Sequence, residues 1–359
     1  MFTVDPEAVD AWSARLSGLA DDAHQAAQYA DTHLRLDGAS WSPAFSNAAA
    51  GVEEARAALM ASADRLHELL GTSAGELARS AELYRSTDRV AAARLDALMD
   101  GPTGADHTPV STVPSTRSGS VGDNPGAALQ PPRAHDPIPD PLEAVLGIAD
   151  WISPAHLVME LLSVICGSNP VSHVAEHIAG DWTALSTVAD ACRKLADFDA
   201  AMGATISGSA EVVLGGSGGW RGEAAGAADA YFAGLARSVD QQWAPVESFG
   251  RQCQALAAQT YAYCKGIEDL LKFLVDLAIS MVISAAAAAF PLVGTIVAGV
   301  AGAVVVARAV RTWESILDII NDLFGAAKLL VGAAGSFAGS LRELSEYRLP
   351  AGAYDHPGV

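Results

Sequence analysis

The first hundred residues alternate between apolar and polar positions with the period of an α-helix. Over residues 5–34 the apolar positions recur at steps of three and four, as in a heptad stripe: Val9, Trp12, Leu16, Leu19, Ala23, Ala26 and Ala30. Asp5 and Pro6 suit the N-cap and first turn of this helix. A Gly- and Pro-containing break, residues 37–43, precedes a second helical pattern over residues 44–100. Two amphipathic helices joined by a short turn predict a helical hairpin whose apolar faces need further helices.

Residues 101–141 lack any apolar period. Nine of the chain's 17 prolines lie there, among Gly, Ser, Thr and Asp. Such a composition cannot bury enough surface to order itself. We therefore predict a linker that tethers two modules, residues 1–100 and residues 142–330, with an Ala/Gly-rich polar tail over residues 331–359.

The second module repeats the plan of the first: a helix, a Trp-bearing turn and a helix. Helical patterns cover residues 142–152, 155–166, 171–178, 182–202 and about 223–269. A Gly- and Ser-rich loop ends at Trp220-Arg221-Gly222, before the last of these helices, in which Pro245 is a candidate kink. The patterns predict an all-α protein of two helical-hairpin modules that pack like a four-helix bundle.

A run without any charged residue extends from Leu277 to Ala307. As one helix of 31 residues it would be about 46 Å long, more than the roughly 30 Å core of a bilayer needs. Pro291 and Gly294 divide it, however, into pieces of roughly 21 and 24 Å, each too short to span. A membrane-inserting hairpin is one interpretation, but the short pieces and the many Ala and Gly favour buried or oligomeric packing. A polar helix over residues 313–324 is expected to follow.

Composition and charge exclude several classes of function. Half of the 359 residues are hydrophobic, and 22 basic against 42 acidic residues give a net charge of −20. Nucleic-acid binding is excluded because phosphate neutralisation needs clustered Lys and Arg. Four cysteines without a Cys-x-x-Cys spacing indicate neither a disulfide scaffold nor a zinc ribbon; they are either free or paired after export. The N-terminus lacks a basic segment followed by an apolar one, so we expect a cytoplasmic protein or export by a route that reads another signal.

One motif is similar to an enzyme site. His173, Glu176 and His177 match the His-x-x-Glu-His pattern of inverzincin metalloproteases, with both imidazoles on one helix face. The helix is short, and nothing singles out a third ligand such as Glu211 or Glu247. No phosphate-binding loop or nucleophile elbow with the right context occurs in the sequence. We therefore expect no catalytic activity, no metal and no cofactor, and interpret the motif as a coincidence at a helix end.

The late part of the first module carries a Tyr-x-x-x-Asp pattern. Tyr84 and Asp88 fall one turn apart on one helix face, as a docking pair needs. Together with the opening residues 2–7 and the hairpin, this pattern resembles the EspC-like family of type VII (ESX) secretion substrates over residues 2–99. In that family a Tyr-x-x-x-Asp/Glu pattern after the hairpin is part of the export signal, and the resemblance implies this role for Tyr84 and Asp88.

The second module is similar to the N-terminal region of actinobacterial ESX-exported proteins and polymorphic toxins. The similarity is carried by residues 165–170, 179–182, 195–198 and 219–222. A Trp-x-Gly turn is the hallmark of small ESX substrates, and such a turn followed by an apolar Ala/Gly hairpin is also similar to EspA-like substrates. The resemblance implies a signal at Trp220 and Gly222. The first module's own turn has Trp41-Ser42-Pro43 and could not supply this half of the signal.

These relatives are understood to cross the membrane as folded helical dimers, one hairpin bearing Trp-x-Gly and the other Tyr-x-x-x-Asp/Glu. Here both halves sit in one chain. The resemblance implies virulence-associated export from the cytoplasm to the cell envelope or outside, recognition by the secretion ATPase, and a small helical ESX partner or self-association. Two alternatives remain open: a membrane-acting, pore- or oligomer-forming effector that works through residues 277–307, and the trafficking portion of a toxin whose enzymatic domain follows Val359.

Overall fold

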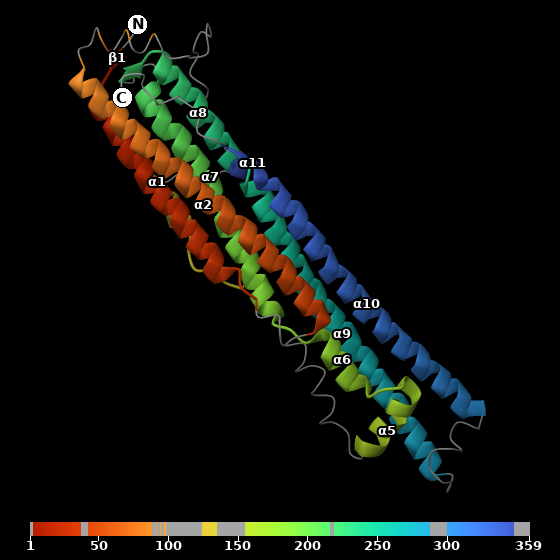
Figure 1. Ribbon diagram of the computed structural model, residues 1–359. Helices are drawn as coiled ribbons and strands as arrows, with labels where there is room; N and C mark the ends of the chain where they lie inside the picture. The colour runs from red at the N-terminus through yellow and green to blue at the C-terminus, as the bar shows by residue number, and fades with distance from the viewer. Residues whose placement is uncertain are drawn as a thin grey trace.

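The computed structural model describes residues 3–36, 42–87, 91, 94, 97, 124–134, 155–215, 219–287 and 300–347. In these ranges the chain is an elongated bundle of long helices, which confirms the all-α prediction (Figure 1). The helices are α1 (Pro6–His33), α2 (Pro43–Ser86), α5 (Ala155–Cys166), α6 (Pro170–Ile178), α7 (Trp182–Leu214), α8 (Glu223–Asp240), α9 (Trp243–Ala287), α10 (Val300–Ser340) and α11 (Arg342–Glu346), with a short 3₁₀ helix η1 (Pro125–Ala128). Two strands, β1 (Thr3–Val4) and β2 (Trp220–Arg221), form a minimal antiparallel pair.

Helices α1 and α2 form the first hairpin as the sequence pattern predicts. The Asp5 carboxylate accepts a hydrogen bond from the Glu7 N–H at 3.0 Å, and Pro6 occupies the first helical position, which starts α1. Every apolar position of the predicted heptad stripe is buried. Helix α2 passes through Gly71 and Gly75 without a break, since its buried face on α1 continues on both sides of them.

The helices of the second half begin and end at other residues than the sequence pattern predicts. Helix α7 continues twelve residues past the predicted end, to Leu214. The break between α8 and α9 falls at Gln241, and Pro245 lies in the first turn of α9, where no intrahelical N–H bond is required. Helix α10 is one continuous helix, because Ala and Gly beyond the polar segment keep a buried face at helical spacing: Ala327, Leu330, Ala334 and Phe337.

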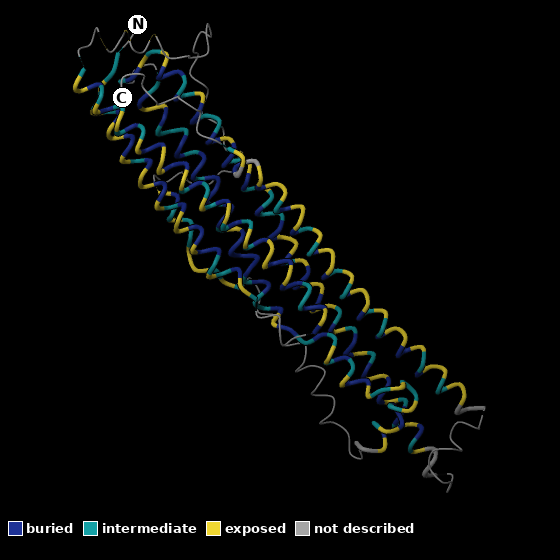
Figure 2. The backbone as a smooth tube through the Cα atoms, viewed as in Figure 1, coloured by how far each residue is buried: buried dark blue, intermediate teal, exposed yellow. Residues whose placement is uncertain are grey.

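Helices from both halves of the chain share one apolar core. Helix α1 packs on α2 and α7, α2 packs along α10, and α7 packs on α8 and α9. Buried positions therefore run as a continuous line through the bundle (Figure 2). The approach of α2 to α10 is close enough that a Cβ atom on Gly51 would lie 3.3 Å from the Leu330 carbonyl group. The two hairpins thus pair within one chain, while the boundaries of the two modules remain a prediction.

Residues 124–134, which the sequence assigns to the linker, lie across α1 and α7; we call this segment the strap. Pro125 is buried, the Tyr29 hydroxyl donates to the Gln130 carbonyl at 2.9 Å, and the Arg133 N–H donates to the Asp190 carboxylate at 2.9 Å. Burial also raises the pKa of Tyr29. The partners of the strap lie far away in the sequence, so a local composition argument could not find it.

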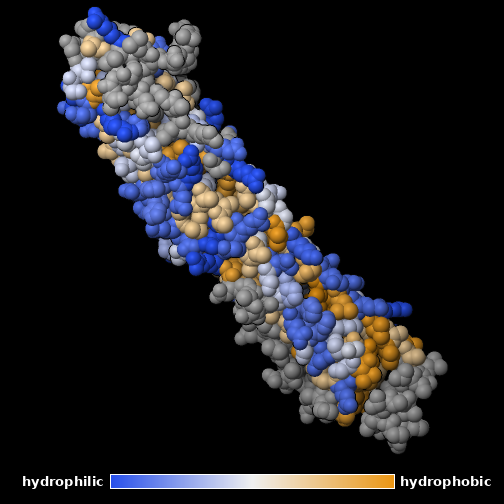
Figure 3. Space-filling model, viewed as in Figure 1, coloured by the Kyte–Doolittle hydropathy of each residue, from blue (hydrophilic) through white to orange (hydrophobic). Residues whose placement is uncertain are grey.

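The described ends of the charge-free run, residues 277–287 of α9 and 300–307 of α10, lie at the end of the bundle opposite β1, near α5 (Figure 1). Leu277 is half-buried and Ala307 is exposed, whereas Pro291 and Gly294 lie outside the described residues. Apolar surface gathers over this part of α9 and α10 (Figure 3), and Ile283 and Val304 are among the exposed side chains. In the described ranges no single helix is long and apolar enough to cross a membrane; one pair bent by 67°, Leu157–Cys166 with Pro170–Leu214, meets the length and composition criteria together.

Candidate functional site

Tyr84 and the Trp220-Arg221-Gly222 turn, which the sequence assigns to the two halves of a signal, lie at one end of the bundle. There the start of α1 and the end of α2 lie beside the turn between α7 and α8 (Figure 1). Val4 lies opposite Trp220 in the strand pair, and the Asp5 N–H donates to the Gly219 carbonyl at 2.6 Å. A Cβ atom on Gly219 would lie 2.7 Å from the Asp5 Cβ, so the arm and the turn fit only because residue 219 is glycine. We call Thr3–Val4 and Asp5 the N-terminal arm.

Tyr84 and Trp220 are in direct aromatic contact. Their ring centroids are 6.1 Å apart and the rings stand at 67°, an edge-to-face arrangement that favours both rings. Trp220 is 1% exposed and Tyr84 is 8% exposed. The Trp220 indole N–H is buried and has no hydrogen-bond partner among the described residues. Packing therefore holds the Trp220 ring, and the aromatic contact with Tyr84 is part of that packing.

Gly222 ends the Trp-x-Gly turn in a conformation that glycine alone adopts readily. Its φ angle is +140°, and it precedes the first residue of α8. A residue with a Cβ atom would be strained here. The spacing of the motif thus has a structural reason: Trp220 enters the core, Arg221 points to solvent, and Gly222 turns the backbone into α8.

Trp12 joins three helices just below the turn. The Trp12 indole N–H on α1 donates to the Ser209 hydroxyl on α7 at 3.2 Å. The centroids of the Trp12 ring and the Phe232 ring on α8 are 4.6 Å apart. Sequence analysis placed Trp12 in the heptad stripe and missed this role. No signal in the sequence could have found it, because Ser209 lies 197 residues further along the chain.

The end of α2 is tied to the start of α1 by an ion pair between Arg85 and Asp10 at 2.8 Å. Both side chains are exposed, so water and salt screen the pair and it contributes little to stability. Asp88 lies outside the described residues. Its predicted place on the same helix face as Tyr84 therefore remains a prediction.

The histidine motif forms an aromatic cluster. The rings of His173 and His177 stack at 4.3 Å between centroids, and His173 also meets the Trp313 ring edge to face at 5.4 Å. Burial, with the neighbouring His177, lowers the pKa of His173, so this ring is neutral at neutral pH. Across the described ranges no three His, Cys, Asp or Glu side chains converge as metal ligands. The imidazoles contact each other and a tryptophan, and the geometry offers no support for a zinc site.

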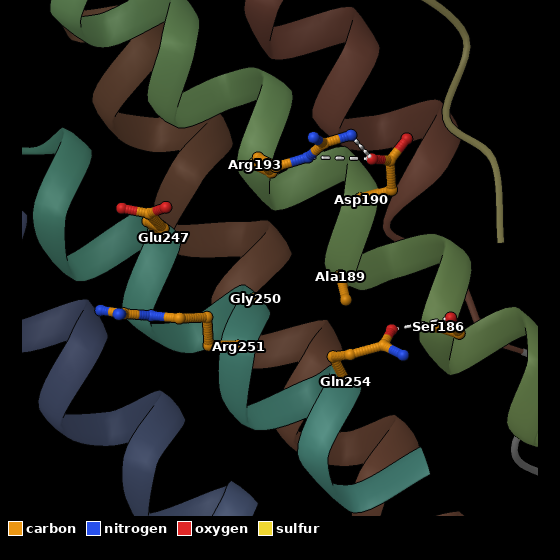
Figure 4. Close-up of a pocket in the computed structure, with 8 residues that line it drawn as sticks. All are labelled: Ser186, Ala189, Asp190, Arg193, Glu247, Gly250, Arg251 and Gln254. Carbon is orange, nitrogen blue, oxygen red and sulfur yellow. Dashed lines mark hydrogen bonds and ion pairs between the residues drawn. The ribbon is translucent and has the colours of Figure 1, made fainter. Parts of the chain in front are cut away.

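A cleft of about 240 Å³ between α7 and α9 carries several charged groups (Figure 4). Arg193 forms an ion pair with Asp190 within α7. The Ser186 hydroxyl donates to the Gln254 side chain at 2.7 Å, which links α7 to α9. Burial opposes ionisation of Asp190, but hydrogen bonds from the strap and from Arg193 prevail and lower its pKa. The cleft is a polar joint of the bundle, and we assign no ligand to it.

The fold, together with the end of the bundle that holds Tyr84 and Trp220, defines a class of protein. It is an elongated all-α bundle in which two helical hairpins pair within one chain, and a Trp-x-Gly turn of one hairpin packs against a tyrosine of the other. Residues 1–97 match the family model described as excreted virulence factor EspC of type VII ESX systems of diderms. The match covers α1 and α2 with Tyr84 and Asp88, and it confirms the resemblance of the first module. It supports a type VII secretion substrate, exported from the cytoplasm to the cell envelope or outside. No curated protein and no solved structure matches the chain.

Proposed function

We propose that this protein is a non-enzymatic type VII secretion substrate whose export signal is split between its two hairpins. Tyr84 and Asp88 form one half, and Trp220 with Gly222 forms the other. The observation that carries the proposal is the edge-to-face contact of Tyr84 with Trp220 at 6.1 Å. The secretion ATPase would read the end of the folded bundle at which the two halves meet.

Pairing within one chain gives this signal a physical check on folding. Tyr84 reaches Trp220 only when the end of α2 lies beside the turn between α7 and α8. A chain whose hairpins have not paired does not form the contact. Because both hairpins belong to one chain, their pairing is intramolecular and does not depend on the concentration of a partner protein.

The test is export of Tyr84→Ala and Trp220→Ala in cells that carry the cognate secretion system. Phe45→Ala is a matched control, because Phe45 is a buried aromatic residue of α2 that meets Trp182 edge to face at 5.1 Å. It lies near the opposite end of α2, about 58 Å along the helix from Tyr84. We expect the first two variants to fold, as measured by circular dichroism, and to stay in the cytoplasm, while Phe45→Ala is exported. Normal export of both signal variants would contradict the proposal.

A second candidate function concerns the opposite end of the bundle. Ile283 and Val304, which both belong to the charge-free run from Leu277 to Ala307, are exposed there. Apolar surface of this kind favours contact with a membrane or with other copies of the chain, and Pro291 and Gly294 would shape the hairpin between the two helices. Leakage of liposomes on addition of the purified protein, lost in Ile283→Asp and retained in Leu329→Asp, would support a membrane role. A protein that is inert towards liposomes and monomeric would exclude both roles.

A further inference from the structure

A protein that reads this end of the bundle cannot bind the rings of Trp220 and Tyr84 to any large extent. Trp220 and Tyr84 are 1% and 8% exposed, because each ring packs into the core. Variants of these residues therefore act by changing the shape of the end. If the proposed function is right, an exposed surface next to the two rings must make the contact with the secretion machinery.

Such a surface lies between α1 and α7, directly beside the tryptophan turn. It is a mostly apolar groove of about 530 Å³, lined by Ala8, Ala11 and Trp12 on α1 and by Ala204, Gly208 and Val212 on α7. Arg15, Thr205 and Ser209 add polar groups to its lining. Ala8 links the groove to the turn, since a Cβ atom on Gly219 would lie 3.3 Å from the Ala8 Cβ. Small side chains on both walls keep the groove open.

Val212 is an exposed apolar side chain in the lining of the groove. It is 77% exposed, the highest value among the exposed large apolar side chains in the described ranges. A valine on the outer edge of an apolar groove gains free energy when a partner covers it. Trp12 fixes the floor, because its indole N–H donates to Ser209 and so holds α1 against α7 at this level.

The lower part of the same seam already holds a peptide. The strap lies along both α1 and α7, and its Pro125 is buried. The Gln130 carbonyl of the strap accepts a hydrogen bond from the Tyr29 hydroxyl on α1. The seam therefore accepts a single polypeptide strand without separating the two helices. The upper groove lies further along the same seam, between the levels of Arg15 and Ala8. Arg15 interacts electrostatically with Asp22, which adjoins Gly126 of the strap.

We propose that the upper groove between α1 and α7 is the docking site for an extended, apolar peptide segment of the type VII secretion machinery. The buried contact between Tyr84 and Trp220 is a positioning element: it sets the end of the bundle, and through it the two walls of the groove. Export then depends on two separable features, a correctly assembled end and an unfilled groove.

The decisive variant is Gly208→Leu. A Cβ atom at Gly208 meets nothing within 4 Å, so leucine fills the groove without a clash and removes a helix-weakening glycine from α7. Gly18→Leu is the matched control. Gly18 is an exposed glycine of α1 outside the groove, and a Cβ atom there would also meet nothing within 4 Å. We expect Gly208→Leu to melt at an equal or higher temperature and yet to be exported about tenfold less, as for loss of a binding hot spot. Gly18→Leu is exported normally.

Two further measurements identify the occupant. Val212→Asp should reduce export as Gly208→Leu does, because a charge on the groove edge must be desolvated when an apolar segment binds. A photo-crosslinking amino acid at position 212, introduced in exporting cells, should give a product that mass spectrometry identifies as a component of the secretion machinery. The same group at position 18 should not. Crosslinks from position 212 only to a second copy, or only within the chain, would overturn the proposal.

The outcomes separate this inference from the proposed function. If Tyr84→Ala and Trp220→Ala block export while Gly208→Leu is exported normally, the groove is not the docking site and the split signal stands. If Tyr84→Ala and Trp220→Ala are themselves exported normally, the split signal is wrong, and the groove proposal falls with it.

Discussion

Tyr84 at the end of α2 and Trp220 in the turn before α8 meet edge to face, with 6.1 Å between their ring centroids. Each residue comes from a different hairpin, and each was predicted from the sequence as half of an export signal. Their contact makes the end of the bundle sensitive to the geometry of both hairpins at once.

Gly222→Ala is expected to destabilise the folded protein by about 1–3 kcal/mol, because its φ angle of +140° strains any residue with a Cβ atom. The measurement is the free energy of unfolding in urea. Gly75→Ala is the control: Gly75 lies inside α2 and a Cβ atom there would meet nothing within 4 Å, so the change should stabilise the protein by up to about 1 kcal/mol. Equal effects of the two changes would contradict the assigned conformation of Gly222.

Gly219→Val is expected to displace the N-terminal arm, since the new Cβ would lie 2.7 Å from the Asp5 Cβ. The Asp5 N–H, which donates to the Gly219 carbonyl, should then exchange with deuterium much faster, while exchange in the middle of α1 is unchanged. Asp5→Ser is the control. Serine retains both the side-chain cap of α1 and the backbone N–H, so the protection of this N–H should be unchanged. Unchanged protection of the Asp5 N–H in Gly219→Val would refute the arm contact.

Tyr29→Phe is expected to loosen the strap at a cost of about 1 kcal/mol, because the hydrogen bond to the Gln130 carbonyl is lost and that carbonyl is left without its partner. Limited proteolysis within residues 124–134 should become faster. Thr32→Val removes a hydroxyl from the exposed part of α1 and serves as the control. A strap that is cleaved equally in both variants would show that the Tyr29 contact does not hold it.

The Asp190 carboxylate should make the stability of the bundle pH-dependent in acid. Its pKa in the folded protein lies below the ordinary value of 3.8, so its contribution is complete above that pH and is lost as the pH falls through the folded pKa. Thermal melts at a series of pH values should show this loss for the wild-type protein. In Asp190→Asn the acid-dependent part should be smaller, because asparagine does not titrate. Identical pH profiles would remove Asp190 from this role.

The cysteines should react in an order set by burial. Cys166 is half-buried, and burial raises the pKa of its thiol to about 11, so it should alkylate slowly near neutral pH because little thiolate is present. Cys192, Cys253 and Cys264 are buried and should react only after unfolding in denaturant. Mass spectrometry of the alkylated protein gives the order directly. Rapid modification of Cys192 in the native protein would contradict the packing of α7 on α9.

Local patterns accounted for the helices that have a clear stripe and a clear start. The heptad stripe with Asp5 and Pro6 predicted α1 almost to the residue, and the segments that became α5 and α6 were also correct. The sequence pattern did not predict the long extensions of α7 and α10. These segments are rich in Gly and Ser, which are typical of loops, but apolar residues at helical spacing continue the buried face of each helix through them. The strap was missed for a related reason, since Tyr29 and Asp190 stabilise it from elsewhere in the sequence.

The sequence by itself determined the all-α class, the hairpin nature of the first module and the residue types of the candidate signal, because these depend on spacing along a helix and on a recognisable family pattern. Only the tertiary structure decided that the two hairpins pair in one chain, that Tyr84 and Trp220 touch, and that both are too buried to be bound directly. Which faces meet depends on contacts between residues far apart in the chain, such as the fit of Gly219 against Asp5 and of Gly51 against Leu330. Periodicity along one helix carries no information about such contacts.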